Sequence, residues 1–184
     1  MATESPGAQI GFAAPTFSLK GTDGRPHTLK ELAGTRGTVV AFICNHCPYV
    51  KAILPRLVRD ARDLGAISVS VIGINSNDAT DYPEDSLQGM VAIAPHLSFP
   101  YLHDESQSVG RAYGAVCTPD FFGFDASLNL RYRGRLDASR MQPAPDGAPR
   151  ELFDAMKMIA ETGRGPETQL ASMGCSIKWR AGTG

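Results

Sequence analysis

Two cysteines three residues apart, Cys44 and Cys47, have the type and spacing that most clearly point to chemistry in this chain. Such a thiol pair can attack a disulfide with one sulfur and release it with the other, and it can also supply thiolate ligands to a metal. Both reactions need a thiolate, and thiolate formation depends on the charges and hydrogen-bond donors nearby. The elements that position the pair therefore decide what it does.

The two cysteines lie at a predicted junction between a strand and a helix. The apolar, β-branched run at 38–43 predicts a buried strand. Pro48 suits the first position of a helix, where its missing N–H costs nothing, and the apolar positions after it repeat with a helical period up to Leu64. Cys47 then lies at the positive end of this helix, beside unpaired N–H groups that favour a thiolate.

The remaining pattern predicts one α/β domain. A second apolar strand at 67–74 completes a βαβ unit with parallel strands, and Asp23-Gly24 predicts an N-terminal hairpin. Helices are expected at 84–94, 105–113 and 150–161, and strands at 99–102, 121–124 and 128–132. We expect residues 1–9 to be a flexible lead-in, 10–163 to form the domain, and 164–184 to be a tail packed on or near it.

Composition and charge argue against nucleic acid or a membrane as the partner. The chain has 184 residues, enough for a single core, and a net charge of -1 with Lys and Arg spread along it. No apolar stretch is long enough to span a bilayer. The first residues lack the basic and apolar regions of a secretory signal, so the expected location is the reducing cytoplasm. There, four cysteines favour catalytic or metal-binding thiols over structural disulfides.

Three more side chains belong to the set of candidate reactive groups. His46 adjoins Cys47 and would stabilise its thiolate when protonated, and a plain exposed loop histidine is the alternative. Cys117 and Cys175 are candidate auxiliary thiols, which would pair with each other or supply an extra resolving thiol, with inert buried cysteines as the alternative. Cys44, His46 and Cys47 also form a soft ligand set suited to zinc or cuprous copper, but a clear second ligand pair is missing. We therefore expect redox chemistry without a metal or cofactor.

The order of the elements, with Thr118-Pro119 just before the predicted hairpin, resembles the thioredoxin superfamily. The resemblance implies that this proline is cis, faces the active-site cysteines and shapes the substrate groove. Thioredoxin's motif is followed by a lysine and a helix-kinking proline, which match Lys51 and Pro55. This register puts Cys47 in the place of the nucleophile and Cys44 upstream of it. The C-x-x-C spacing alone favours the competing assignment, with Cys44 as nucleophile and Cys47 as resolving thiol.

Peroxiredoxins share this fold, and their motif Pro-x-x-x-Thr-x-x-Cys is similar to the same segment. Cys47 takes the peroxidatic place, Cys44 that of the threonine and Val40 that of the proline, which implies that the Cys44 thiol reaches the Cys47 sulfur. Aligning 122–125 on the family's strand puts Pro119 where the peroxiredoxin arginine stands. Because the threonine and arginine that polarise a peroxide are both replaced, the resemblance favours dithiol exchange over peroxide reduction.

From about residue 10 to 180, the chain resembles the peroxiredoxin-like branch of redoxins, described as alkyl hydroperoxide reductase/thiol-specific antioxidant or thioredoxin family proteins. Five segments carry the resemblance: Phe42–Lys51, Gly73–Asp78, Tyr113–Asp120, Tyr132–Asp137 and Gly174–Trp179. The fold class that it implies is α/β and thioredoxin-like, with a central mixed β-sheet flanked by helices and an N-terminal β-hairpin.

The function that the resemblance implies is a thiol-disulfide oxidoreductase in which Cys47 attacks and Cys44 resolves. His46, Pro48 and Thr118-Pro119 would support the site or line the groove. The partners would be protein or small-molecule disulfides, with a thiol reductant as electron donor. The alternatives are a thiol peroxidase that reduces hydroperoxides through Cys47 as an antioxidant, and a non-catalytic module that binds a metal or a protein.

Overall fold

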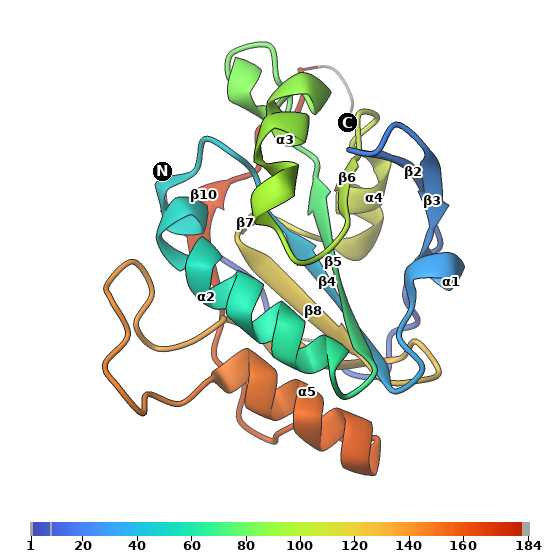
Figure 1. The fold of residues 1–184 in the computed structure, drawn as a ribbon, viewed down its shortest axis with the longest axis vertical. Coiled ribbons are helices and arrows are strands. Elements are labelled where there is room, and N and C mark those ends of the chain that lie inside the picture. Colours follow the sequence, from blue (N-terminus) through green and yellow to red (C-terminus); the bar gives the residue numbers. More distant parts are fainter. Residues whose placement is uncertain (1, 8, 182–184) are drawn as a thin grey trace.

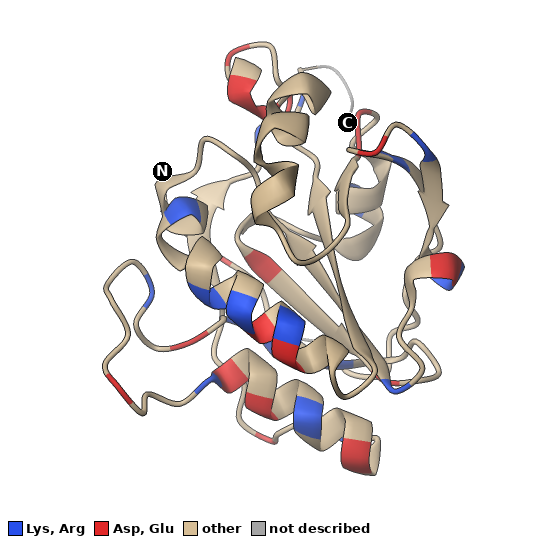
Figure 2. Ribbon diagram, viewed as in Figure 1, with Lys and Arg blue, Asp and Glu red and all other residues tan. Residues whose placement is uncertain are grey.

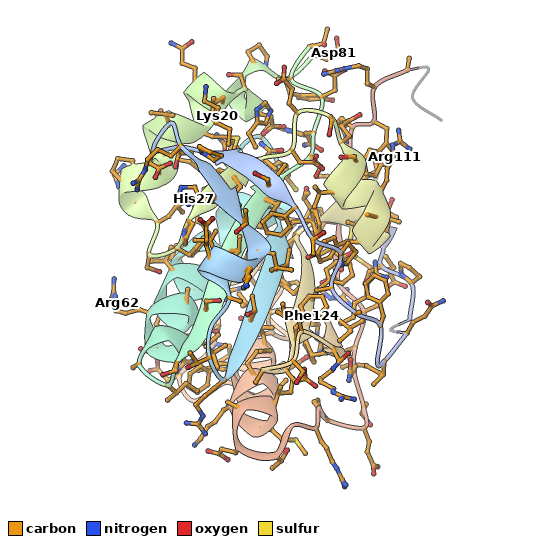
Figure 3. The ribbon with its side chains drawn as sticks, turned by 90° about the vertical axis from the view of Figure 1, so that its right-hand side faces the viewer. Lys20, His27, Arg62, Asp81, Arg111 and Phe124 are labelled. Carbon is orange, nitrogen blue, oxygen red and sulfur yellow. The ribbon has the colours of Figure 1, made fainter. Side chains whose placement is uncertain are left out.

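A seven-stranded mixed sheet forms the centre of the computed structural model, which describes residues 2–7 and 9–181 (Figure 1). The strand order is β3-β2-β6-β5-β4-β8-β9. Strand β5 runs parallel to β4 and β6, and the other neighbours are antiparallel. The strands of this sheet are β2 (Ser18–Gly21), β3 (Pro26–Thr28), β4 (Gly37–Phe42), β5 (Val69–Asn75), β6 (Tyr101–His103), β8 (Asp120–Phe124) and β9 (Leu130–Gly134). The expected mixed sheet and N-terminal hairpin are thus confirmed, and Figure 3 views the molecule from the side of this hairpin.

Two helical layers cover the faces of the sheet, because the residues of the fully buried β4 alternate between two apolar cores. Val39 and Ala41 pack with α2 (Pro48–Gly65), α3 (Leu87–Ile93) and α5 (Glu151–Thr162). Val40 and Phe42 pack on the other face with α1 (Leu29–Leu32) and α4 (Ser108–Tyr113). In the described ranges 2–7 and 9–181, no helix combines the length and apolar character needed to cross a membrane.

The helix bounds follow local capping chemistry. The helix expected at 84–94 begins only at Leu87, because Pro83–Asp85 forms a separate 3-10 turn and the Ser86 hydroxyl accepts a hydrogen bond from the Gly89 N–H. A second 3-10 turn, Ala94–His96, follows it. Helix α5 ends at Gly163, whose left-handed backbone (φ 73°) suits glycine.

Charged residues of both signs lie along α2 and α5 (Figure 2), and Arg150, the N-cap of α5, joins the two helices. Arg150 donates hydrogen bonds to Asp60 at 2.8 Å and to Asp63 at 2.7 Å. The Asp60 carboxylate is buried, so this contact compensates a charge that would otherwise be costly in the core. The pair fixes α5 against the helix that begins at the cysteines.

A second sheet of three strands, ordered β1-β10-β7, brings residues 2–4 and 173–176 to the cysteine side. It consists of β1 (Ala2–Glu4), β10 (Met173–Ser176) and β7 (Cys117–Thr118), all antiparallel. Residues 2–4 form a strand where we expected a flexible lead-in, and residues 173–176 of the expected C-terminal tail pair with it. Such short strands carry little periodicity and are defined by distant pairing partners. Residues 1, 8 and 182–184 of those two segments lie outside the described part, and the division of the chain at 9 and 163 stays a prediction.

Candidate active site

Cys47 is the N-cap of α2, and Pro48 occupies the first helical position as expected. The strand β4 ends at Phe42, so the loop that carries Cys44 leaves the C-terminal edge of the sheet and turns directly into the helix. Both thiols are buried, with 1% and 0% of Cys44 and Cys47 exposed. The pair therefore lies inside the molecule at the positive end of an 18-residue helix.

The Thr118-Pro119 peptide is cis and lies against both cysteines. The Thr118 hydroxyl is 3.1 Å from the Cys44 sulfur, and the Thr118 carbonyl accepts a hydrogen bond from the Cys47 thiol at 3.2 Å. The structure thus brings together four of the residues singled out in the sequence. Cys47 lies at the N-terminus of α2 and Cys44 in the loop before it, and which of the two attacks stays a prediction.

The surroundings of Cys47 lower its pKa to about 4. The largest cause is the Cys44 thiol, which acts as a donor to the Cys47 sulfur, and burial opposes it. The Cys175 thiol and the backbone N–H groups of Val50 and Cys175 add further donors. The Thr118 carbonyl favours the protonated form, but four donors outweigh one acceptor. These donors favour the thiolate form of Cys47.

Cys44 is the opposite case, because its pKa is raised far above that of an ordinary thiol. Its donor contact to Cys47 is the main cause, followed by burial and by the negative charge of Asp85. A single proton thus stays on the Cys44 sulfur and points toward the Cys47 sulfur. This asymmetry agrees with an attacking thiolate at Cys47 and a protonated partner at Cys44.

The two candidate auxiliary thiols are placed differently. Cys175 on β10 lies opposite Thr118 in the ladder, shares its face and contacts Cys47. Cys117 precedes Thr118 on β7, so its side chain points to the other face, where it is fully buried and its pKa is raised by burial. All four cysteines are free thiols. The pairing of Cys117 with Cys175 that the sequence left open is therefore not favoured by this arrangement.

The loop between the two cysteines is fastened by Asp85, which the sequence analysis did not single out. Its buried carboxylate accepts hydrogen bonds from the backbone N–H groups of Asn45 at 2.6 Å and His46 at 3.2 Å, and from the Asn77 amide at 2.9 Å. It also contacts the His46 ring, which stacks on Tyr82 with ring centroids 4.0 Å apart. His46 is therefore no plain exposed histidine, and its contacts hold the loop in place.

Replacing Asp85 with alanine is expected to lower the free energy of unfolding by about 3 kcal/mol, because several buried N–H donors lose their acceptor. Urea denaturation would measure it. Glu84→Ala is the matched control, because the exposed Glu84 carboxylate makes only a long contact, 3.9 Å, with Lys51. This variant should lose less than about 0.5 kcal/mol of unfolding free energy. Equal losses in the two variants would show that Asp85 does not anchor the loop.

Among the residues that the structure describes, one set of side chains could hold a metal ion. Ligand atoms of Cys44, His46 and Asp85 all lie within 4.8 Å of one another. Asp85 replaces Cys47 in the set expected from the sequence, because the His46 ring turns toward this carboxylate. Asp85 also binds the backbone N–H groups of Asn45 and His46, so the same carboxylate orders the loop.

A small, mostly apolar pocket lies beside Pro119 of the cis-proline step. Tyr49 of the first α2 turn, Pro119 and Met173 line it, together with Ile53, Phe121, Leu136 and polar groups such as Arg135 and Asp137. Met173 is two residues before Cys175 on β10, so both side chains lie on the same face. The pocket is thus bordered by the elements that also carry the reactive thiols.

The contact between β10 and the cis-proline step depends on Gly174. A Cβ atom at this position would lie 1.9 Å from the Thr118 carbonyl oxygen. Only glycine therefore lets β10 approach closely enough for Cys175 to reach Cys47. Gly174 lies in one of the segments that resemble redoxins, but the sequence did not show that this glycine packs against Thr118.

Comparisons with known proteins agree with this site. The chain matches the AhpC/TSA family over residues 10–133. An uncharacterized conserved protein from Geobacillus kaustophilus is 44% identical, with a TM-score of 0.93 over 100% of this chain and 98% of its own. A hypothetical protein from Sinorhizobium meliloti is 39% identical, with a TM-score of 0.92 over 98% of this chain and 100% of its own. No curated protein matches significantly.

More distant structures share the fold. The thioredoxin domain of a thiol-disulfide oxidoreductase from Bacteroides vulgatus has a TM-score of 0.62 at 13% identity, covering 84% of this chain and 99% of its own. At this identity the likeness concerns the fold alone. With the family matched over most of the chain and this fold around a buried thiol pair, the protein belongs to the AhpC/TSA family of thioredoxin-like redoxins.

Proposed function

We propose that this protein is a thiol-disulfide oxidoreductase in which Cys47 attacks the substrate disulfide and Cys44 resolves the mixed disulfide. The observation that carries the proposal is the placement of the Cys47 sulfur at the N-terminus of α2, with the Cys44 thiol as a donor to it. This arrangement supports a thiolate at Cys47 and a second thiol ready to attack it.

The exchange proceeds in two balanced steps. The Cys47 thiolate attacks one sulfur of the substrate disulfide, forms a mixed disulfide and releases the first substrate thiolate. Cys44 then loses its proton and attacks the Cys47 sulfur, and the second substrate thiolate leaves and takes up a proton. The protein gains one disulfide and the substrate gains two thiols. A thiol reductant, acting in the reducing cytoplasm that we propose as the location, would return the protein to its dithiol form.

The substrates that we propose are protein or small-molecule disulfides that enter by the apolar pocket beside Pro119. The pocket has apolar walls from Tyr49, Phe121 and Met173, which suit a peptide side chain or an apolar disulfide substituent. The cis Thr118-Pro119 step lies between this pocket and the sulfurs. A substrate that fills the pocket would therefore bring its disulfide near Cys47.

Family membership makes thiol peroxidase activity the second candidate. Peroxide reduction would use the same Cys47, but Cys44 and Pro119 stand where peroxiredoxins carry the threonine and the arginine. The groups around Cys47 are thiols and backbone N–H groups, with no formal positive charge among the main causes of its lowered pKa. We therefore favour disulfides over peroxides as substrates.

Two assays separate the candidates. The oxidoreductase should accelerate the reduction of insulin by dithiothreitol, and its reaction with hydrogen peroxide in stopped flow should be no faster than that of a free thiol. Rapid oxidation of Cys47 by peroxide, without any effect on insulin, would reverse the order of the two candidates. Tight, stoichiometric binding of zinc together with inactivity in both assays would favour a metal-binding module.

A further inference from the structure

Cys175 is a thiol beside the nucleophile to which the proposed exchange gives no role. Its side chain packs against the core cluster that contains Cys44 and Cys47. It lies on β10, in register with Thr118 and therefore on the face that looks toward the thiol pair. Among the four cysteines it is the one that is only partly buried.

The Cys47 sulfur thus has a thiol neighbour on each of two separate elements. Cys44 approaches from the loop after β4 and is held by the Thr118 hydroxyl at 3.1 Å. Cys175 approaches from the C-terminal strand, which Gly174 allows to pack directly on Thr118. Either thiol can reach Cys47 without a change in the order of the strands.

We propose that Cys175 is a second resolving thiol, which competes with Cys44 for the Cys47 mixed disulfide and forms a Cys47–Cys175 disulfide. This inference rests on the proposed function, in which Cys47 is the nucleophile, and it deepens that function. It assigns a catalytic role to the C-terminal strand.

The second route has the same balance of atoms and electrons as the first. The Cys175 thiol loses its proton and its sulfur attacks the Cys47 sulfur of the mixed disulfide. The bond between Cys47 and the substrate sulfur breaks, and the substrate leaves as a thiolate that takes up a proton. The net reaction turns one substrate disulfide and two protein thiols into two substrate thiols and one protein disulfide. No further oxidant or reductant is needed.

Cys175 has one advantage over Cys44 as an attacking thiol. It is partly exposed, whereas Cys44 is buried, so water can accept the proton that Cys175 must lose. We therefore expect the oxidised protein to be a mixture of molecules with a Cys44–Cys47 disulfide and molecules with a Cys47–Cys175 disulfide.

The test follows the lifetime of the mixed disulfide between Cys47 and hydroxyethyl disulfide, a small probe, by intact-mass spectrometry after acid quenching. In Cys44→Ser the adduct should be short-lived, because Cys175 still resolves it. In Cys44→Ser/Cys175→Ser the adduct should persist at least about tenfold longer. Cys44→Ser/Cys117→Ser is the matched control and should behave like Cys44→Ser, because Cys117 points to the other face.

The outcomes distinguish this inference from the function on which it rests. Equal adduct lifetimes in Cys44→Ser and Cys44→Ser/Cys175→Ser would overturn the role of Cys175 and leave Cys47 as the nucleophile. Peptide mapping of the oxidised wild-type protein should also find a Cys47–Cys175 link, and finding Cys44–Cys47 alone would overturn the inference in the same way. An adduct that maps to Cys44 in Cys47→Ser, at the wild-type rate, would overturn the proposed function as well.

Discussion

Replacing Cys47 with serine is expected to reduce the rate of insulin reduction about a thousandfold or more. A hydroxyl at this position is not ionised at neutral pH and cannot form the mixed disulfide, although the N-terminus of α2 remains in place. The change is small in volume and replaces a thiol that is 0% exposed, so circular dichroism should show an unchanged fold. The insulin assay with dithiothreitol measures the loss.

The comparison with Cys44→Ser tests which of the two cysteines is the nucleophile. Serine at position 44 can keep the hydrogen bond to the Thr118 hydroxyl, so the first attack by Cys47 should remain fast, and resolution should then depend on Cys175 alone. Single-turnover reaction with hydroxyethyl disulfide separates the two steps. If Cys44→Ser abolished adduct formation while Cys47→Ser still formed an adduct, the C-x-x-C spacing would have indicated the right nucleophile and the thioredoxin register the wrong one.

The reduced protein is expected to keep a thiolate down to an acidic pH, with a midpoint near pH 4 for Cys47. An ordinary cysteine, with a pKa near 8.5, is about 3% ionised at pH 7, whereas Cys47 should be almost fully ionised there. The ultraviolet absorbance of the thiolate, recorded during an acid titration, measures the midpoint. Cys47→Ser should remove this transition, which would assign it to Cys47.

A second variant tests whether the Cys44 thiol is the main cause of the low pKa of Cys47. Cys44→Ala removes the largest of the stabilising donors while Cys175 and the backbone N–H groups remain, so the midpoint should rise by about one to two pH units. A midpoint unchanged in Cys44→Ala would show that the helix terminus and the backbone alone stabilise the thiolate. A wild-type midpoint near 8.5 would contradict the whole arrangement of donors.

The same ionisation links stability to pH. Between pH 4 and the ordinary thiol range, the unfolded chain holds a proton at Cys47 that the folded protein has lost, so the free energy of unfolding rises with pH. The contribution of Cys47 is fully present above the unfolded pKa and is lost as the pH falls through about 4. Its slope is at most about 1.4 kcal/mol per pH unit. The difference between the wild-type protein and Cys47→Ser isolates this slope from other titrating groups.

Much of the fold follows from local patterns that the sequence displays directly. The buried run of β4, the periodic apolar face of α2 and the glycine after α5 are signals within a few residues of one another, and each element was found near its predicted place. Pro48 also marked the start of α2 to the residue, because proline suits the first helical turn. Cys47 was therefore recognisable as an N-cap thiol from sequence alone.

Other features depend on contacts between distant parts of the chain and could not be predicted from the sequence. Strand β10 has only four residues, and its ladder joins position 175 to position 118, so no local periodicity marks it. Asp85 lies 39 positions from His46, in a turn whose composition resembles many surface loops. A buried carboxylate can be recognised only when the donors that surround it are known.

The sequence by itself thus determined the two cysteines at the start of α2, because short-range periodicity and capping chemistry carry that information, and its resemblance to known redoxins indicated the fold class and the family. Tertiary structure decided that Cys175 contacts Cys47, that Cys117 faces away and that His46 is bound by Asp85. The physical reason is that a thiol's reactivity depends on which donors lie within a few ångströms of the sulfur. Those donors come from β10 and the first turn of α2 as well as from the cysteine loop, and only folding brings them together.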